Sequence, residues 1–509
     1  MAEKLSLNQQ AKKDDLIKFI KECTASPNSY THYTEFKRIN ECLCDVLNLQ
    51  NISILDFDDP AEFIGIIDKL KVNEKYKTYN IKGKNQYSSA VQNYLTYLFA
   101  RKYASLAKEN FVKVQPIKFG EFNISANYRS YITAIKSKPF LLLAGISGTG
   151  KSRIVRELAR ACWEEDSEEY KTQKPKNFEM IQVKPNWHDS SELIGYVSRI
   201  NGEKFIVGPF LKFMVKAIQN PDIPHFLCLD EMNLAPVEQY FAEYLSVIES
   251  RKFIEGEILT DPIIDYEDTD AYKSLIDQLF YEDEIRREYL TKENGKRLRI
   301  PKNLIVVGTV NMDETTFSFS RKVLDRAMTI EMNEVDLEGG LDKKYESIGK
   351  LGEAELIGYA VEGVDVYADN KDVCNIAINY LKAINEKLEG TPFKVAYRTR
   401  NEFLLYVVNN LPYNKDENGE EISQEMVIAR ALDEITNMKI LSRIEGDETK
   451  VSKEFLNDLR ETIKKELNKI SQKEYSGTKG KVGTEYAVSL AKLKEMTTRL
   501  GSGYTSFWS

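Results

Sequence analysis

The stretch Phe140-Leu-Leu-Leu-Ala-Gly-Ile-Ser-Gly-Thr-Gly-Lys-Ser152 decides the fold. It joins an apolar run of strand length to the pattern G-x-x-x-x-G-K-[ST], and an amphipathic helix follows over residues 153–160. Glycines let backbone N–H groups turn inward around phosphates, and the following helix directs its positive end at the same anion. The stretch therefore predicts a phosphate-binding loop between a strand and a helix of an α/β domain.

Each position of this loop has an expected task. Lys151 is expected to reach the β- and γ-phosphates of a nucleotide, and the Ser152 hydroxyl is expected to bind Mg²⁺. The other nucleotide contacts are expected from Gly145, Ser147, Gly148, Thr149 and Gly150. The octapeptide alone occurs by chance in unrelated proteins, but the strand before it and the helix after it favour a genuine site.

A second apolar run ends in two adjacent carboxylates. It reads Phe226-Leu-Cys-Leu-Asp-Glu231, and folding alone does not require two acids at a strand end. In a phosphate-loop site Asp230 would hold the hydration shell of Mg²⁺, and Glu231 would orient and polarise an attacking water. Together the two motifs predict hydrolysis of a nucleoside triphosphate.

Composition sets broad limits on the chain. With 509 residues, 42% hydrophobic and 29% charged, it is typical of a globular protein of two to four domains, and the net charge of −8 argues neither for nor against nucleic acid. The six cysteines include no Cys-x-x-Cys pair, and we expect Cys228 to be a core residue. No signal peptide and no apolar run of ~20 residues occurs, so we expect a cytoplasmic protein without a membrane segment.

Three regions differ in pattern. Residues 1–110 are expected to be a mostly helical accessory domain, 111–335 an α/β domain with a parallel sheet, and 336–509 a second helical region. A polar, acid-rich insertion, part loop and part helix, is expected at about 254–300. Strands of the sheet are expected at 140–144, 178–183, 226–230 and 304–310.

From about 136 to 332 the chain resembles the AAA+ superfamily, and more closely its branch containing MoxR, midasin and the McrB restriction motor. Asp230-Glu-Met-Asn-Leu-Ala-Pro236 is similar to the branch motif D-E-I-N-R-A-P, and residues 244–251 resemble the L-L-x-x-L-E-x-R that follows it. Residues 189–195 and 205–210 resemble elements around an insertion in the second core helix. The resemblance implies such an insertion at about 187–212, often facing a central pore.

The resemblance also implies roles for three later residues. Val307-Gly-Thr-Val-Asn311 is similar to the strand that ends in sensor 1, which implies that Asn311 contacts the γ-phosphate or the nucleophilic water. Residues 320–326 resemble a helix whose arginine reaches the neighbouring subunit's nucleotide, and arginine suits transition-state charge on phosphate. Arg326 is the first choice for this finger and Arg321 the second. A surface ion pair is the alternative for each.

The second helical region looks most like the lid of McrB-type proteins from modification-dependent (type IV) restriction systems. Residues 396–402 resemble its Y-R-x-R-x-E helix start, which implies that Arg398 or Arg400 acts as sensor 2 and contacts the nucleotide. The McrB-type GTPases carry M-N-T-A-D-R at sensor 1, whereas this chain has Val310-Asn-Met-Asp-Glu-Thr315. The missing arginine favours ATP, with GTP as the alternative.

This resemblance implies a ring-forming motor, which we expect to be a homo-hexamer because a finger in trans makes each active site a two-subunit object. In a restriction system it would bind and translocate double-stranded DNA in a bacterial or archaeal cytoplasm. A separate McrC-like nuclease would cut, since the sequence shows no nuclease constellation. The alternative is a MoxR-like ATP-dependent chaperone that remodels a protein complex without DNA.

The accessory region discriminates these two hypotheses. A DNA motor should gather basic and aromatic side chains on one face there. The alternative is an ordinary solvated helical face. The candidates are Lys71, Lys75, Lys77, Lys82, Lys84, Arg101 and Lys102, with Tyr76, Tyr79 or Tyr87.

Overall fold

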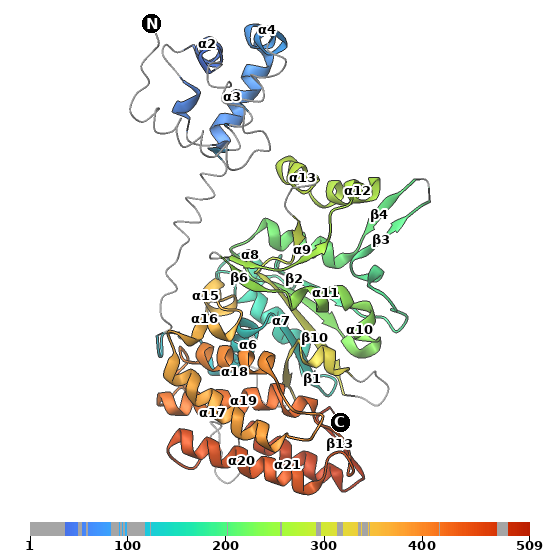
Figure 1. Cartoon of the computed structure of the whole chain (residues 1–509), viewed down its shortest axis with the longest axis vertical. Helices are drawn as coiled ribbons and strands as arrows, with labels where there is room; N and C mark the ends of the chain where they lie inside the picture. Colours follow the sequence, from blue (N-terminus) through green and yellow to red (C-terminus); the bar gives the residue numbers. More distant parts are fainter. Residues whose placement is uncertain are drawn as a thin grey trace. The chain divides into compact units, whose positions relative to one another are not determined.

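The computed structural model of the chain divides it into two compact units, residues 1–115 and 116–509 (Figure 1). We placed the first boundary at 110, and the two later regions that we distinguished, 111–335 and 336–509, share the second unit. The structure describes residues 36–48, 53–57, 60–82, 91, 94, 97, 98, 118–122, 124–200, 202–254, 257–291, 297–312, 319–333, 337, 345, 347–416, 418–475 and 487–508.

The described part of the first unit is helical. It holds α2 (Phe36–Leu47), the 3-10 turn η2 (Ile54–Asp56), α3 (Pro60–Val72) and α4 (Glu74–Lys82). Their apolar faces form a small core of their own, in which Phe63 and Tyr94 meet edge to face. Val91, Tyr94, Tyr97 and Leu98 also belong to this core.

The prediction that Tyr76 lies on a basic and aromatic face for DNA is wrong. This side chain is 5% exposed and belongs to the core, and burial raises its pKa to about 12. Lys75 pairs with Asp45 at 3.0 Å, and Lys77 pairs with Glu74 at 2.8 Å. An acidic side chain therefore lies beside each of these two lysines. Four other candidates, Lys84, Tyr87, Arg101 and Lys102, lie outside the described residues.

A five-stranded parallel sheet, in the order β11-β1-β10-β5-β2, forms the centre of the second unit. Four strands confirm the predicted ones, and β11 was not predicted because its short run Met-Thr-Ile-Glu has little apolar signal. The central strands are buried on both faces, as expected for a parallel sheet, and Cys228 is a fully buried core residue. The strands are β1 (Phe140–Gly145), β2 (Phe178–Gln182), β5 (His225–Asp230), β10 (Leu304–Asn311) and β11 (Met328–Glu331).

Helices cover the two faces of this sheet, as the predicted α/β class requires. Leu141 and Leu143 of β1 pack on one side with α6 (Ala126–Ser137) and α7 (Lys151–Arg160). The alternate residue Leu142 packs on the other side with helices of the 209–248 region. The remaining helical segments here are α8 (Glu168–Lys171), η3 (Ser190–Glu192), α9 (Pro209–Gln219), η4 (Met232–Leu234), α10 (Val237–Tyr240), α11 (Ala242–Ile248) and α14 (Arg321–Leu324).

Two excursions leave the sheet on the same side of the unit (Figure 1). The first is the hairpin β3–β4 (Gly195–Ser198 and Lys204–Val207), inside the range predicted for the helix-2 insertion. The second contains strands as well as the expected helices, and its α12 packs along β4, where Gln278 Nε2 donates to the Phe205 carbonyl at 2.9 Å. It comprises β6 (Lys252–Ile254), β7 (Glu257–Leu259), β8 (Pro262–Ile264), α12 (Asp270–Leu279), α13 (Glu284–Leu290) and β9 (Leu298–Arg299).

The carboxy-terminal region is the predicted helical lid. Its aromatic end docks on its own chain: Trp508 Nε1 donates to the Ser442 carbonyl at 2.8 Å and its ring lies 5.2 Å from that of Phe319. The lid comprises α15 (Glu353–Leu356), α16 (Gly363–Tyr367), α17 (Lys371–Lys387), α18 (Tyr397–Asn410), α19 (Gln424–Lys439), η5 (Leu441–Arg443), β12 (Glu445–Asp447), α20 (Lys453–Ser471), α21 (Val488–Leu500) and β13 (Tyr504–Ser506). Among the helices that the structure describes, none has the length and apolarity to cross a bilayer.

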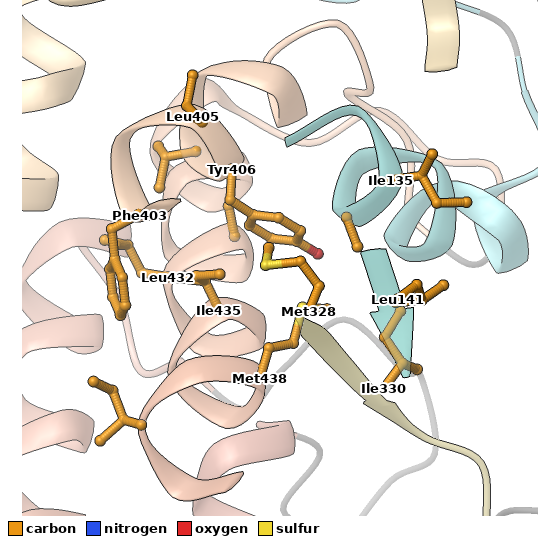
Figure 2. Packing of buried hydrophobic residues seen from close by; sticks show 14 of the residues in the cluster. Ile135, Leu141, Met328, Ile330, Phe403, Leu405, Tyr406, Leu432, Ile435 and Met438 are labelled. Carbon is orange, nitrogen blue, oxygen red and sulfur yellow. The ribbon is translucent and has the colours of Figure 1, made fainter. Parts of the chain in front are cut away.

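The lid is packed directly against the edge of the sheet. Figure 2 shows Met328 of β11 and Leu141 of β1 facing Tyr406 of α18 and Met438 of α19, all within one hydrophobic cluster. This continuous core explains why the sheet and the lid form a single compact unit.

A buried ionic network accompanies this packing. Lys439 of α19 is 1% exposed, lies 2.9 Å from the Glu402 carboxylate of α18, and donates to the Ala327 carbonyl at 2.7 Å. Lys138, which follows α6, pairs with the same carboxylate. Burial opposes ionisation of Glu402, but the two lysines hold its pKa below its usual value. One carboxylate therefore neutralises two cations where the lid meets the sheet.

Replacing Glu402 with Gln should lower the free energy of unfolding by about 3–5 kcal/mol, because it leaves two lysines without their buried counter-charge. Urea denaturation followed by circular dichroism measures the change. Glu448→Gln, at an exposed position, is the matched control and should change stability by less than about 0.5 kcal/mol. Equal stability of the two variants would contradict this role for Glu402.

Candidate active site

The phosphate loop connects β1 to α7, as predicted. Gly148 and Gly150 adopt φ values of 85° and 82°, a left-handed conformation that favours glycine. Gly145 is required for space, because a Cβ there would lie 2.6 Å from the Met332 carbonyl oxygen. With Ser147 and Thr149, these glycines form a loop whose backbone leads into the N-terminus of α7.

Lys151 and Ser152 are the first two residues of α7. The Lys151 ammonium donates to the carbonyls of Gly145 at 3.0 Å and Ile146 at 2.7 Å, and the side chain is buried. The ammonium is thus held beneath the loop, where it can add phosphate oxygens to its partners. The anion-binding helix end and this fixed charge lie together at one end of β1.

The two predicted acids lie at the same edge of the sheet. Asp230 ends β5, and the register that pairs Gly145 of β1 with Asn311 of β10 places the loop beside sensor 1. The Asn311 Nδ2 donates to Glu231 Oε1 at 2.9 Å. The phosphate loop, Asp230, Glu231 and Asn311 therefore meet where the parallel strands end, which is the edge at which such sheets usually bind ligands.

Thr309 organises both acids and was missed at the sequence level. Its hydroxyl donates to Asp230 Oδ1 at 2.8 Å and accepts from the Glu231 backbone N–H at 2.9 Å. The signal was present, since Thr309 and Asn311 are two residues apart on one strand and so point to the same face. A polar residue at that spacing inside an apolar strand marks the face that carries chemistry.

Glu231 has a strained backbone. Its φ of 53° lies in the left-handed region, which costs a non-glycine residue about 1–3 kcal/mol. The hydrogen bonds to Thr309 and Asn311 hold Glu231 in this conformation. Asn233 supports the same corner by donating to the Asn311 carbonyl at 3.1 Å.

The donor set fits Mg²⁺. The Ser152 hydroxyl and the Asp230 carboxylate are hard oxygen ligands, and Mg²⁺ typically takes one or two carboxylates together with substrate phosphates. Within the described ranges no group of three or more His, Cys, Asp or Glu side chains is placed to hold a metal ion. A bound Mg²⁺ would neutralise charge on the phosphates at this position.

The predicted arginines have partners elsewhere. Arg326 pairs with Glu249 at 2.9 Å, and Arg398 pairs with the same carboxylate at 2.6 Å. Arg321 donates to the Pro392 carbonyl of the lid and lies over Phe393, and Arg400 lies over Tyr397. Among the described contacts, none joins these four arginines to the phosphate loop, so the structure does not bring Arg398 or Arg400 to it.

Comparison with known proteins agrees with this geometry. A family model described as AAA domain (dynein-related subfamily) matches residues 140–262, and one described as a domain of unknown function (DUF8727) matches 359–503. The type IV methyl-directed restriction enzyme EcoKMcrB subunit of Escherichia coli (strain K12) is 24% identical over 205 residues. The chain therefore carries an AAA domain and is similar to AAA+ proteins of the McrB/MoxR-like kind.

The similarity is partial in extent. The match covers 40% of this chain and 36% of the length of the EcoKMcrB subunit. A crystal structure of a "putative ATPase" from Cytophaga hutchinsonii ATCC 33406 is similar over 67% of this chain and 90% of that one, at 15% identity and a TM-score of 0.34. The AAA match includes the phosphate loop and both acids and ends before Asn311 and Arg326.

Thr309→Val should lower kcat by roughly 10- to 100-fold, because a hydrogen bond to a charged group is worth about 1.5–3 kcal/mol. Nucleotide affinity should be retained, since the loop is untouched. Release of phosphate in steady state, with ATP binding by calorimetry, measures the two quantities.

Two further variants calibrate this experiment. Glu231→Gln should retain the nucleotide and lose about 10²- to 10⁴-fold in turnover, the range for a positioned acid or base. Thr329→Val repeats the substitution at another buried threonine of the sheet, whose hydroxyl makes no hydrogen bond with the described residues, and should leave kcat unchanged. If Thr309→Val behaved like Thr329→Val, Thr309 would not position the acids.

Proposed function

We propose that this AAA+ protein is the motor subunit of an McrBC-like restriction system. It would form a ring, hydrolyse ATP, and move double-stranded DNA for a separate McrC-like nuclease in a bacterial or archaeal cell. The observation that carries the proposal is the grouping of the phosphate loop, Asp230, Glu231 and Asn311 at one edge of the sheet, in a chain similar to the EcoKMcrB restriction subunit. The lid sequence at 396–402 gives further support.

In this proposal the residues of one subunit bind and orient the reactants. Lys151 and the loop amides hold the β- and γ-phosphates, and Ser152 and Asp230 hold the cation. Glu231 orients the attacking water, and Asn311 fixes the Glu231 carboxylate at the hydrogen-bond distance described above. These groups supply binding and water activation but no cation at the far side of the γ-phosphate.

That missing cation is proposed to be Arg326 of a neighbouring copy. Arg326 is paired with Glu249 and has no described contact with its own phosphate loop, so it has to serve a different nucleotide if it serves one at all. A closed arrangement in which every copy lends its arginine to the next is a ring, and we propose a hexamer. Arg321 is a poorer candidate because it is fastened to the lid of its own chain.

A second candidate function has a specific observation in its favour. The described part of the first unit buries Tyr76 and places an acid beside each of Lys75 and Lys77, which weakens the basic and aromatic face proposed to bind DNA. A MoxR-like chaperone that remodels a protein complex needs no such face. The two hypotheses share the hydrolytic site and differ in whether DNA alters its turnover.

Arg326→Ala should lower ATP hydrolysis by about 10³-fold, the lower range for loss of an arginine finger. Mixed with Lys151→Ala subunits it should regain activity, because the latter provide a finger while the former provide a nucleotide. Steady-state phosphate release from the mixture measures the rescue. Arg321→Ala, in the same mixture, is the control and should not be rescued. A mixture with no more activity than its parts would contradict a finger in trans.

The restriction hypothesis predicts that double-stranded DNA stimulates hydrolysis, and that the stimulation falls steeply between low and physiological salt. Phosphate release from ATP and from GTP, each with and without DNA, measures both the partner and the nucleotide. Hydrolysis of ATP that is indifferent to DNA would favour the chaperone. A preference for GTP would contradict the choice of ATP.

A further inference from the structure

A line of side chains connects the phosphate loop to the strand β11. Asn333, just beyond β11, accepts a hydrogen bond from the Ile146 backbone N–H at 3.1 Å. The Asn333 Nδ2 donates to Glu331 Oε1 at 2.5 Å. Asn333 is not part of the loop sequence, but its side chain fixes the backbone of the loop at Ile146, one residue after Gly145.

The same carboxylate reaches the C-terminal helix. Lys492 of α21 donates to Glu331 Oε1 at 2.9 Å and is 3% exposed. Its ammonium also lies 4.6 Å from the centre of the Phe507 ring. The buried Lys492 ammonium thus contacts Glu331, and Glu331 in turn contacts Asn333. Phe507, near the end of the chain, packs over the same ammonium.

The final residues also contact the segment that precedes the arginine finger. Trp508 packs on Phe319, two residues before Arg321, and is tied to the lid through Ser442. The C-terminal segment 488–508 therefore contacts both the support of the phosphate loop and the residues just before α14.

We propose that Asn333, Glu331 and Lys492 are positioning residues for the phosphate loop, so that the packing of α21 sets the affinity of the loop for the phosphates of ATP. The inference rests on the proposed function only in requiring that the loop binds ATP. Loss of the Asn333 contact frees Ile146 and with it the backbone amides that follow, which must converge on one anion.

Charge on Glu331 is essential to this arrangement. Burial raises the pKa of Glu331, whereas Lys492 lowers it, Glu495 raises it and Arg499 lowers it. An ionised Glu331 accepts from Asn333 and Lys492 at the same oxygen, Oε1, and protonation removes the negative charge that holds the Lys492 ammonium there. Without the Lys492 charge, the carboxyl should protonate at a higher pH, so ATP affinity that depends on ionised Glu331 is lost earlier as pH falls.

The test is calorimetric titration of the full chain with Mg²⁺ and ATP from about pH 5.5 to about pH 8, which spans the range of a raised carboxyl pKa. Lys492→Met should bind about ten-fold more weakly at the acid end and recover as pH rises. Lys494→Met, an exposed position on the same helix, should follow the wild type throughout. Asn333→Ala, at an exposed side chain, should bind about three- to ten-fold more weakly across the range.

The outcomes separate the two proposals. A wild-type protein that binds no ATP would overturn the proposed function and this inference together. A wild-type protein that binds ATP, with Lys492→Met and Asn333→Ala both matching it at every pH, would overturn the inference alone. If Lys492→Met does not fold, the affinity of Asn333→Ala decides the matter.

Discussion

Parallel pairing of β10 between β1 and β5 is the constraint on which the site depends. It aligns Gly145 with Asn311 and places Thr309 beside Asp230 and Glu231, so that groups far apart in the chain meet at one edge. Because the inner strands are buried on both faces, a slip in register would expose apolar surface and separate the catalytic groups at once. Stability of the sheet and geometry of the site are therefore set by the same contacts.

Much of this arrangement could be predicted because it is local. The loop motif, the paired acids and the apolar strands are each contained in a few consecutive residues. What could not be predicted is long-range: the short strand β11 depends on pairing with β1, and Arg398 meets Arg326 only through Glu249. The prediction for Tyr76 is wrong for the same reason, since a tyrosine in a lysine-rich helix can pack in a small core as readily as it can stack on a nucleic acid.

Glu231 and Glu402 are two glutamates that this fold holds in unfavourable settings, the first in its backbone conformation and the second in its burial. Glu231 occupies an unfavourable backbone conformation and is held by hydrogen bonds to Thr309 and Asn311. Glu402 is buried and is held by two lysines from different parts of the chain. The first arrangement orients an acid for chemistry. The second joins the lid to the sheet, so the lid helices and the strand edge behave as one mechanical body.

The brace between α12 and the β3–β4 hairpin has a consequence for motion. An isolated two-stranded ribbon bends easily, but this one has a helix packed along β4 and a side-chain bond from Gln278 to its backbone. Its tip carries Ile200, which is 82% exposed. The brace therefore stiffens the ribbon, and any rotation of the sheet would move Ile200 farther than it moves the base of the hairpin.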